Sequence, residues 1–453
     1  MARRPRAVFV TLLACTLLAG LTNGAQAVRG SSQRGAAAPA VLAPAKPKGT
    51  APTALGVQKV LAASMKDPSL GRHHGVYVYD ASRGKAVYSA GIATGFVPAS
   101  TMKLLTTVSA LETMGPDHTF TTKVVRSGAG SIILVGGGDP LLTTKRVTDS
   151  LDFPPRASLQ ELAASTATAL KAEGVTSVTL GYDAGLFTGP AANAKWEPNY
   201  LTEGIAARTS ALWVNEGRLN PGLAKRATSP AQAAAAAFAL QLRAAGITVA
   251  KAIKPAVAAS PGEDVAQVHS ASLGDIVEYV NLHSDNDGAE VLLRHVGLAT
   301  DNGGSYAGGI EGVRTTLTKL GLNVSKARIE DGSGLSRTNQ VPLDVLAGAV
   351  RVAASPDKPQ LRHLLTGLPV AGFTGSLEDR FASPGTSAGT GLVRAKTGTL
   401  TGVHSLAGLV RTTSGTVLVF AVATDSAPPA KALDARAALD RASAALSTCG
   451  CIS

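Results

Sequence analysis

Apolar residues recur along this chain in two spacings, one typical of helices and one typical of strands. Leu104, Leu105, Val108 and Leu111 share the helical spacing, and Gly115 suits the end of that helix. Comparable patterns predict further helices near residues 57–63, 158–174, 229–246, 272–280, 290–296, 313–320, 343–352 and 430–446. Strands are predicted where apolar and β-branched residues cluster between turn residues, at 76–79, 85–88, 120–125, 132–135, 175–180, 247–249, 406–410 and 417–422.

The order of these elements predicts a multidomain α+β protein, because 453 residues exceed one compact core. Residues 55–118 and 268–453 supply strands from both ends of the chain, which implies one antiparallel sheet flanked by helices. Between them, two units of helix, glycine and strand indicate an inserted, smaller α/β domain at residues 119–267. The helix of the first unit begins with a capping box at Ser158.

The N-terminus has the features of a secretory signal peptide at residues 1–27. Three arginines precede an apolar stretch, and Ala25-Gln26-Ala27 fits a cleavage site. An uncleaved anchor is the alternative, and the sequence around Cys15 resembles a lipoprotein box only loosely. Residues 28–54, rich in Ala, Pro, Gly and Ser, are interpreted as a flexible linker. We therefore expect a secreted protein acting in the cell envelope, in the periplasm or the cell wall.

Net charge adds to this picture. Loss of the three signal-peptide arginines lowers the net charge from +12 to +9, which suits loose association with a membrane surface or anionic wall polymers. Nucleic acid is not expected as a partner, because no basic helix carries interleaved aromatic residues. Cys449 and Cys451 could form a small strained disulfide, but they are too close together to staple a fold. The histidines lack the spacing of a metal site, so no metal is predicted.

Ser100 and Lys103 stand at the start of the apolar helix that ends at Gly115, just after Pro98. Their spacing places a hydroxyl and an amine on one helical face. A serine becomes a nucleophile when a base takes its proton, and a lysine can be that base when burial or a second cation keeps it neutral. The helix N-terminus favours negative charge developing beside the serine. A capped core helix is the alternative for this spacing alone.

The same spacing recurs at Ser355 and Lys358, where two prolines indicate a loop rather than a helix. Partners elsewhere in the chain must therefore decide which pair is catalytic. Two short motifs follow Ser100-x-x-Lys103 in order, Ser284-Asp285-Asn286 and Lys396-Thr397-Gly398. This ordered triplet is a signature of penicillin-binding proteins and serine β-lactamases. Taken singly, Ser284 could lie in a helix–helix turn and Lys396 at a solvated strand start.

Each motif residue has a chemical reason to be present. Ser284 can relay a proton between Lys103 and a leaving amine, and Asn286 can hold a substrate amide and help fix Lys103. The Lys396 ammonium can keep Lys103 neutral and attract a substrate carboxylate.

The strand that Lys396 begins adds further contacts. Thr397 and Thr399 can hydrogen-bond that carboxylate, and Gly398 lets substrate backbone approach the strand. The backbone N–H groups of Ser100 and Thr399 are candidates for the oxyanion hole.

Around the triplet the chain resembles class C low-molecular-mass penicillin-binding proteins, the D-alanyl-D-alanine carboxypeptidase/endopeptidases. The resemblance covers residues 55–447 and extends to four auxiliary stretches, Gly138-Asp139-Pro140-Leu141, Asp331 to Ser336, Leu368 to Gly372 and Ala395 to Leu400. It implies a penicillin-recognising (β-lactamase/transpeptidase-like) domain with an inserted domain. In that family an aspartate of the inserted domain meets the free amine of the peptidoglycan side chain, and the matching stretch here points to Asp183. A turn aspartate at a strand end is the alternative.

The sequence thus predicts an exported serine-type D-alanyl-D-alanine carboxypeptidase, with endopeptidase activity also open. Its partners would be peptidoglycan peptides and β-lactam antibiotics, with no cofactor. A serine β-lactamase is the nearest rival, but it needs a second base, and the closest candidate, Glu330, adjoins the stretch that resembles the peptidases. A non-catalytic wall-binding protein would be expected to have lost part of the triplet, and none is lost.

Overall fold

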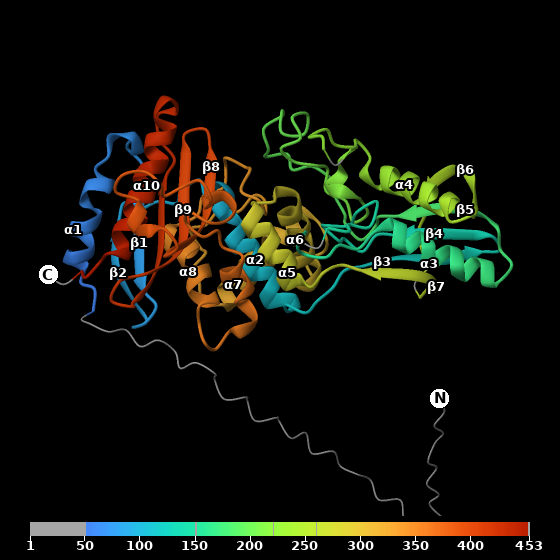
Figure 1. Ribbon diagram of the computed structural model, residues 1–453, viewed down its shortest axis with the longest axis horizontal. Coiled ribbons are helices and arrows are strands. Elements are labelled where there is room, and N and C mark those ends of the chain that lie inside the picture. Colours follow the sequence, from blue (N-terminus) through green and yellow to red (C-terminus); the bar gives the residue numbers. More distant parts are fainter. Residues whose placement is uncertain (1–50, 150–151, 221, 260, 452–453) are drawn as a thin grey trace, which may run out of the picture. The chain divides into compact units, whose positions relative to one another are not determined.

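The computed structural model describes residues 51–149, 152–220, 222–259 and 261–451. The predicted signal peptide and the linker up to residue 50 lie outside these residues. Within them no helix is both long and apolar enough to cross a membrane. Two five-stranded sheets organise the described chain, one drawn in blue and red and the other in cyan, green and yellow (Figure 1).

The first sheet is antiparallel, with the strand order β2-β1-β10-β9-β8. Two of its strands come from the start of the described chain, β1 (His74–Asp80) and β2 (Lys85–Ala90). The other three come from its end, β8 (Val393–Leu400), β9 (Val403–Arg411) and β10 (Val417–Thr424). The predicted antiparallel sheet built from both ends of the chain is confirmed.

Both faces of this sheet are covered, because successive side chains of a strand point to opposite faces. In β10 the alternate residues Leu418, Phe420 and Val422 pack into one hydrophobic cluster, with residues of α1 (Ala54–Met65) and α10 (Ala432–Ser447). The residues between them, Val419, Ala421 and Ala423, pack into a second cluster with α8 (Leu343–Ala353). Next to α10, Cys449 and Cys451 form a disulfide.

Helix α2 (Lys103–Met114) is the centre of the second cluster. All of its first nine residues are buried, and it contacts α5 (Leu273–His283), α6 (Asn286–Ala299), α7 (Tyr306–Lys319), α8 and α9 (His363–Thr366). The helix that carries the predicted nucleophile is therefore held on several sides by other helices. This packing fixes the position of the residues at its N-terminus.

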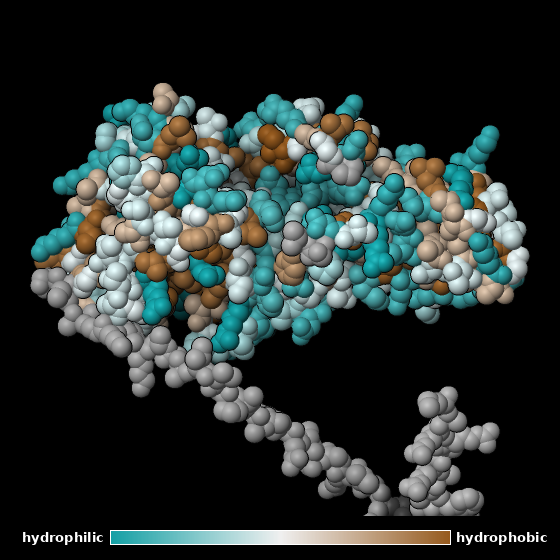
Figure 2. Space-filling model, viewed as in Figure 1, coloured by the Kyte–Doolittle hydropathy of each residue, from teal (hydrophilic) through white to brown (hydrophobic). Residues whose placement is uncertain are grey.

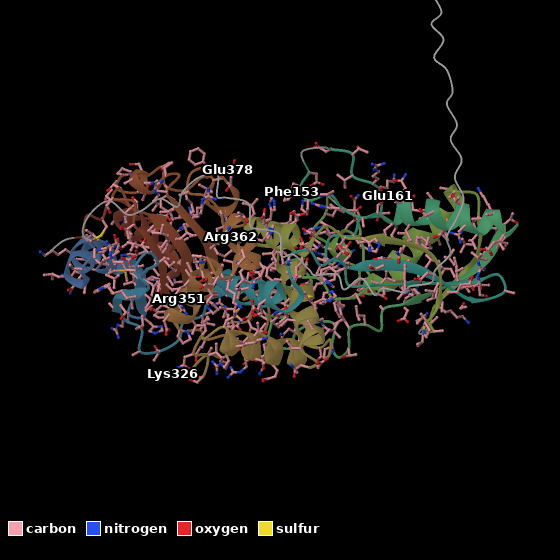
Figure 3. All side chains as sticks on the ribbon, turned by 90° about the horizontal axis from the view of Figure 1, so that it is seen from below. Phe153, Glu161, Lys326, Arg351, Arg362 and Glu378 are labelled. Atoms are coloured by element: carbon pink, nitrogen blue, oxygen red, sulfur yellow. A yellow bond between two sulfur atoms is a disulfide. The ribbon has the colours of Figure 1, made fainter. Side chains whose placement is uncertain are left out.

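The second sheet has the order β6-β5-β4-β3-β7. Its strands are β3 (Thr121–Gly128), β4 (Ser131–Val135), β5 (Ser177–Asp183), β6 (Thr248–Pro255) and β7 (Glu263–His269). Strands β4, β5 and β6 are parallel neighbours, so their connections cross over through α3 (Leu159–Ala172) and α4 (Pro230–Ala244). Both helices pack on the sheet with their own hydrophobic cluster, and Figure 3 shows Glu161 of α3 among these elements.

This sheet differs in detail from the sequence prediction. Strand β5 extends to Asp183, β6 extends to Pro255, and β7 was not predicted at all. Most positions of β6 and β7 are exposed or half-buried, and charged or polar residues interrupt their apolar ones, so neither strand shows a clear apolar alternation. Since β7 pairs with β3 up to His269, the sheet runs two residues past the expected limit of 267. On the face shown in Figure 2, apolar residues lie in small groups among hydrophilic ones.

Candidate active site

Ser100 lies on a 3-10 turn, Ala99–Met102, that leads directly into α2. Ala99 has a φ of 47°, in the left-handed region that non-glycine residues seldom adopt. Gly334 packs against this turn so closely that a Cβ there would meet the Ala99 carbonyl oxygen at 1.8 Å. The turn is thus held from outside in a conformation that it would not adopt alone, and Ser100 is placed by it.

Lys103, three residues on, is fully buried and its Nζ atom has three acceptors. It donates to Ser100 Oγ at 2.9 Å, to Asn286 Oδ1 at 2.8 Å and to the Ser333 carbonyl oxygen at 2.9 Å. Burial lowers the pKa of Lys103 from 10.5 to about 8, although nearby carboxylates, Asp285 foremost, raise it in part. A lysine of this pKa can exchange a proton with a serine hydroxyl near neutral pH.

The second motif stands where α5 meets α6. Ser284 ends α5 with a φ of 57°, and Asp285 caps α6 by accepting from the N–H groups of Asp287 and Gly288. The sharp junction turns Ser284 and Asn286 toward the two lysines. Lys396 Nζ lies 2.9 Å from Ser284 Oγ. This hydrogen bond links the Lys396-Thr397-Gly398 motif to the Ser284-Asp285-Asn286 motif.

Lys396 is the second fully buried lysine, on edge strand β8. Its Nζ also donates to the Thr397 carbonyl oxygen at 3.0 Å. Burial lowers the pKa of Lys396 well below its usual range, and the nearby Lys103 lowers it further. The sequence predicted instead that Lys396 is the charged lysine and that its charge keeps Lys103 neutral. Carboxylates raise the pKa of Lys103 in part, and they stabilise the charge on Lys103 rather than on Lys396.

The rest of β8 lies close to the serine turn. A Cβ on Gly398 would meet Ser405 Oγ at 2.1 Å and the Pro98 carbonyl oxygen at 2.5 Å, so glycine is required there. Thr397 Oγ1 is 2.7 Å from Ser376 Oγ. Lys396 itself lies within β8, which begins at Val393, and not at the strand start that the sequence suggested.

Three contributors to this centre were not identified from the sequence. The Ser333 carbonyl binds Lys103, and buried Glu290 holds the loop that carries it by accepting from the N–H groups of Gly332 and Ser333. Asn286 Nδ2 donates to the Ile205 carbonyl oxygen at 3.0 Å. Backbone carbonyls leave no signal in a sequence, but Glu290 stands four residues after Asn286, one turn along the same helix.

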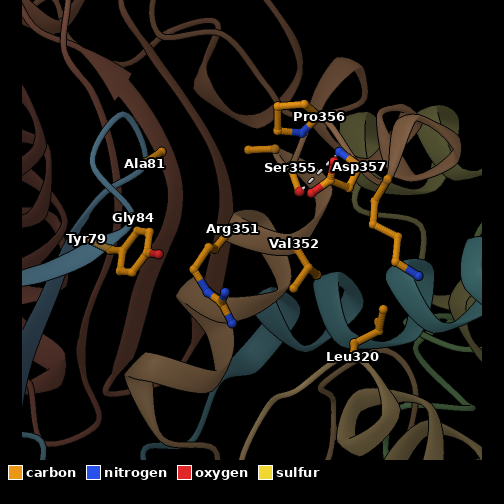
Figure 4. A pocket seen from close by; sticks show the side chains of 11 residues that line it. Tyr79, Ala81, Gly84, Leu320, Arg351, Val352, Ser355, Pro356 and Asp357 are labelled. Atoms are coloured by element: carbon orange, nitrogen blue, oxygen red, sulfur yellow. Dashed lines mark hydrogen bonds between the residues drawn. The ribbon is translucent and has the colours of Figure 1, made fainter.

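The Ser355 pair does not form a comparable centre. Ser355 Oγ accepts from the Asp357 N–H, and Lys358 forms an ion pair with Glu112 at 2.7 Å. Figure 4 shows Ser355 and Asp357 on the wall of a different pocket, beside Arg351. The loop expected there is present.

Asp183 lies at the end of β5, in the second sheet. Its carboxylate accepts from the N–H groups of Gly185 and Ala258, both at 2.8 Å. It lines a cavity of about 910 Å³ together with residues that include Lys123 and Leu186. The predicted strand-end position is therefore present, and the groups that bond to its oxygens are backbone amides.

Comparison with known proteins identifies relatives for nearly the whole described chain. The model of the D-Ala-D-Ala carboxypeptidase 3 (S13) family matches residues 57–228 and 222–446. Carboxypeptidase Rv3627c of Mycobacterium tuberculosis is 34% identical over 88% of this chain and 85% of its own length. Carboxypeptidase DacB of Mycolicibacterium smegmatis is 32% identical over 98% of this chain and 96% of its own length. The resemblance drawn from the motifs is thereby confirmed.

A solved structure agrees on the fold. Penicillin binding protein 4 (dacB) from Haemophilus influenzae superposes with a TM-score of 0.68, at 22% identity over 85% of this chain and 98% of that one. The predicted penicillin-recognising fold is confirmed by this match.

Proposed function

Because the chain belongs to the D-Ala-D-Ala carboxypeptidase 3 (S13) family and is a serine-type D-alanyl-D-alanine carboxypeptidase, we propose that Ser100 is its nucleophile. Ser100 Oγ attacks the carbonyl of the penultimate D-Ala of a peptidoglycan stem peptide. Neutral Lys103 takes the hydroxyl proton, and the amide bond breaks as Ser284 relays this proton from Lys103 to the departing D-Ala amine. Water then hydrolyses the acyl-enzyme. The observation that carries this is the 2.9 Å contact between the fully buried Lys103 Nζ and Ser100 Oγ.

β8 serves as the binding edge for the substrate's C-terminal carboxylate in this proposal. Lys396 attracts the carboxylate, while the Thr397 and Thr399 hydroxyls bond to it. A carboxylate beside Lys396 raises the pKa of that lysine, so substrate recharges it. The new cation lowers the pKa of Lys103, which keeps Lys103 neutral and ready to accept a proton when substrate is bound. The backbone N–H groups of Ser100 and Thr399 stabilise the oxyanion.

Residues 119–267 form an accessory domain in this proposal, and Asp183 reads the free amine of the substrate side chain. Support comes from its place at the end of β5, on the wall of a cavity. The carboxylate now accepts hydrogen bonds from two backbone N–H groups. A bound ammonium group would donate to it in addition to them or in their place. Because penicillin has no such amine, this contact affects peptides alone.

Export to the cell envelope is also part of the proposal, with residues 1–27 as the signal peptide and the basic charge favouring loose binding to membrane or wall polymers.

Cleavage of peptide cross-links is a second activity of the same acyl-enzyme chemistry. Relatives support the peptidase role, because proteins named carboxypeptidase match over most of the chain.

The proposal is tested by labelling the protein with a fluorescent penicillin, mapping the adduct, and digesting purified peptidoglycan with mass analysis of the products. We expect one adduct on Ser100 and release of D-Ala from pentapeptides. An adduct on another residue would overturn the role of Ser100, and cleavage without D-Ala release would redefine the enzyme as an endopeptidase only.

A further inference from the structure

Arg226 is a buried cation outside the three motifs, with only 5% of its side chain exposed. Its Nη2 atom lies 2.7 Å from the carboxylate of Asp287, which is itself 4% exposed, and 3.4 Å from the Gly204 carbonyl oxygen. Its Nη1 atom donates to the Glu216 carbonyl oxygen at 2.8 Å. The guanidinium therefore joins three separated parts of the chain, one of which is the first turn of α6.

The segment that Arg226 holds has two further contacts with α6. The Ala207 N–H donates to Asp287 Oδ1 at 2.6 Å. Two residues earlier, the Ile205 carbonyl oxygen accepts from Asn286 Nδ2. Arg226 and Ala207 thus bond to the two oxygens of Asp287. We call these two contacts the Asp287 clamp. They fix the segment that carries the Ile205 carbonyl, and so the position of that carbonyl relative to Asn286.

The Ile205 carbonyl decides which way the Asn286 side-chain amide faces. A carbonyl oxygen can only accept, so it selects the Nδ2 end of the amide. The Oδ1 end is then left to accept from Lys103 Nζ at 2.8 Å. If the amide turned over, its NH₂ group would face the lysine, and two donors would oppose each other whenever Lys103 is protonated.

We propose that Arg226 is a positioning residue for acylation, which holds the Gly204–Ala207 segment so that the Ile205 carbonyl keeps Asn286 Oδ1 on Lys103. The inference rests on the proposed roles of Ser100 and Lys103. It extends the reaction centre to a residue that hydrogen-bonds to none of the three motifs but lines a cavity together with Ser284 and Asn286. Like the outer partners of other catalytic groups, it acts by fixing the orientation of another residue, here Asn286, which contacts Lys103.

The test must separate misplacement from misfolding, since removing Arg226 alone leaves the Asp287 carboxylate buried without its cation. The informative protein is therefore Arg226→Gln combined with Asp287→Asn. Two amides replace the ion pair there, and the new amide oxygen on α6 still accepts from the Ala207 N–H. Glutamine is too short to bond the carbonyls of Glu216 and Gly204 together.

Two further variants complete the set. Arg226→Lys keeps the charge and loses the fork of donors. Arg218→Gln is the matched control. Arg218 shares the Glu216 carboxylate with Arg226, at 2.9 Å and 3.5 Å respectively, but forms no ion pair with Asp287.

Stopped-flow labelling with a fluorescent penicillin gives three quantities for each protein. They are the moles of label bound per mole of protein (the amplitude), the dissociation constant of the non-covalent complex and the acylation rate constant. For the double variant and for Arg226→Lys we expect at least a ten-fold lower acylation rate constant. The amplitude should be unchanged, and the dissociation constant should stay within about two-fold. Arg218→Gln should match the wild type in all three quantities.

A wild-type acylation rate constant in the double variant would overturn the proposal. A reduced amplitude with an unchanged rate constant would also overturn it, because Arg226 would then serve folding alone. An equal loss in Arg218→Gln would do so too, since the effect would not depend on the clamp. Ser100→Ala is run beside them, and labelling of that protein at the wild-type rate would refute the proposed function itself, which the Arg226 result cannot do.

Discussion

The two sheets of this protein present their polar groups in opposite ways. Beside the first sheet, Lys103 and Lys396 are fully buried, and both donate to side-chain and backbone oxygens of the motifs or their neighbours. At the second sheet, Asp183 is half exposed and its oxygens accept from the backbone of its own surroundings.

Under the proposed roles, the difference separates the residues that carry out the chemistry from the residue that binds the substrate side chain. A buried cation is costly unless its donors are satisfied, so the first site needs a particular set of side chains at fixed positions. A partly exposed carboxylate costs little, so its neighbours need not be specialised and its ligand is not evident from them. Replacement at the first site should therefore affect every substrate, whereas replacement at the second should affect only substrates that reach it.

The largest effect is expected for Ser100→Ala, which removes the group that forms the covalent bond. Penicillin acylation and D-Ala release should both fall by on the order of 10⁴-fold or more. Fluorescent-penicillin labelling and peptide hydrolysis measure this, with Ser355→Ala as the control that stays at the wild-type rate. If Ser100→Ala is still labelled at the wild-type rate, Ser100 is not the nucleophile and the proposed difference in role between the two regions is wrong.

A smaller and more selective loss is expected for Lys396→Ala. Since a buried charged partner of the substrate carboxylate is removed, the preference for a peptide with a free C-terminal D-Ala over its C-terminal amide should fall by roughly 100-fold. The ratio of kcat/KM values for the two peptides measures this preference. If the ratio stays at its wild-type value, β8 does not select the carboxylate.

The second sheet is tested by Asp183→Ala, for which we expect roughly ten-fold lower kcat/KM on peptides with a free side-chain amine. Peptides whose amine is acetylated should show little change, and benzylpenicillin acylation should remain nearly unchanged. Equal losses on free and acetylated peptides would mean that Asp183 is structural. The accessory domain would then need another role.

The smallest expected effect comes from pH. Lys103 must be neutral to accept a proton, and burial places its pKa at about 8. The second-order rate constant for benzylpenicillin acylation reports the free enzyme, in which no substrate carboxylate lies beside Lys396. It should therefore rise about five-fold between pH 7 and pH 8 and level off above about pH 9. A rise that continues to about pH 10 would show that Lys103 keeps the pKa of an exposed lysine.

Much of the catalytic region could be predicted from the sequence, because its motifs combine short spacing with demanding chemistry. Ser100 and Lys103 share a helical face by spacing alone, and the structure places Ser100 Oγ and Lys103 Nζ 2.9 Å apart. The contribution of Ser333 could not be predicted, because any residue can supply a carbonyl and only the fold brings it to Lys103.

The second sheet was harder to predict for a different reason. Strands β6 and β7 carry charged side chains at exposed positions, which interrupt the apolar alternation that marks a strand. The pairing of β7 with β3 includes the ion pairs of Lys123 with Asp264 and of Arg126 with Glu263, which only the folded arrangement brings together. Which of Lys103 and Lys396 has the lower pKa could not be predicted either. It depends on which carboxylates lie near each amine, and the fold rather than the spacing in the sequence determines this.

The pairing of β1 with β10 links catalysis to the order in which the chain is synthesised. Residues 74–80 pair with residues 418–424, so the first sheet lacks its central strand until almost the whole polypeptide exists. The second sheet comes from a contiguous stretch and can assemble earlier, as separate units of a growing chain do. Lys396 and the strands that bury it arrive last. A chain truncated before residue 393 would therefore contain Ser100 without Lys396 and without three of the five strands of the first sheet.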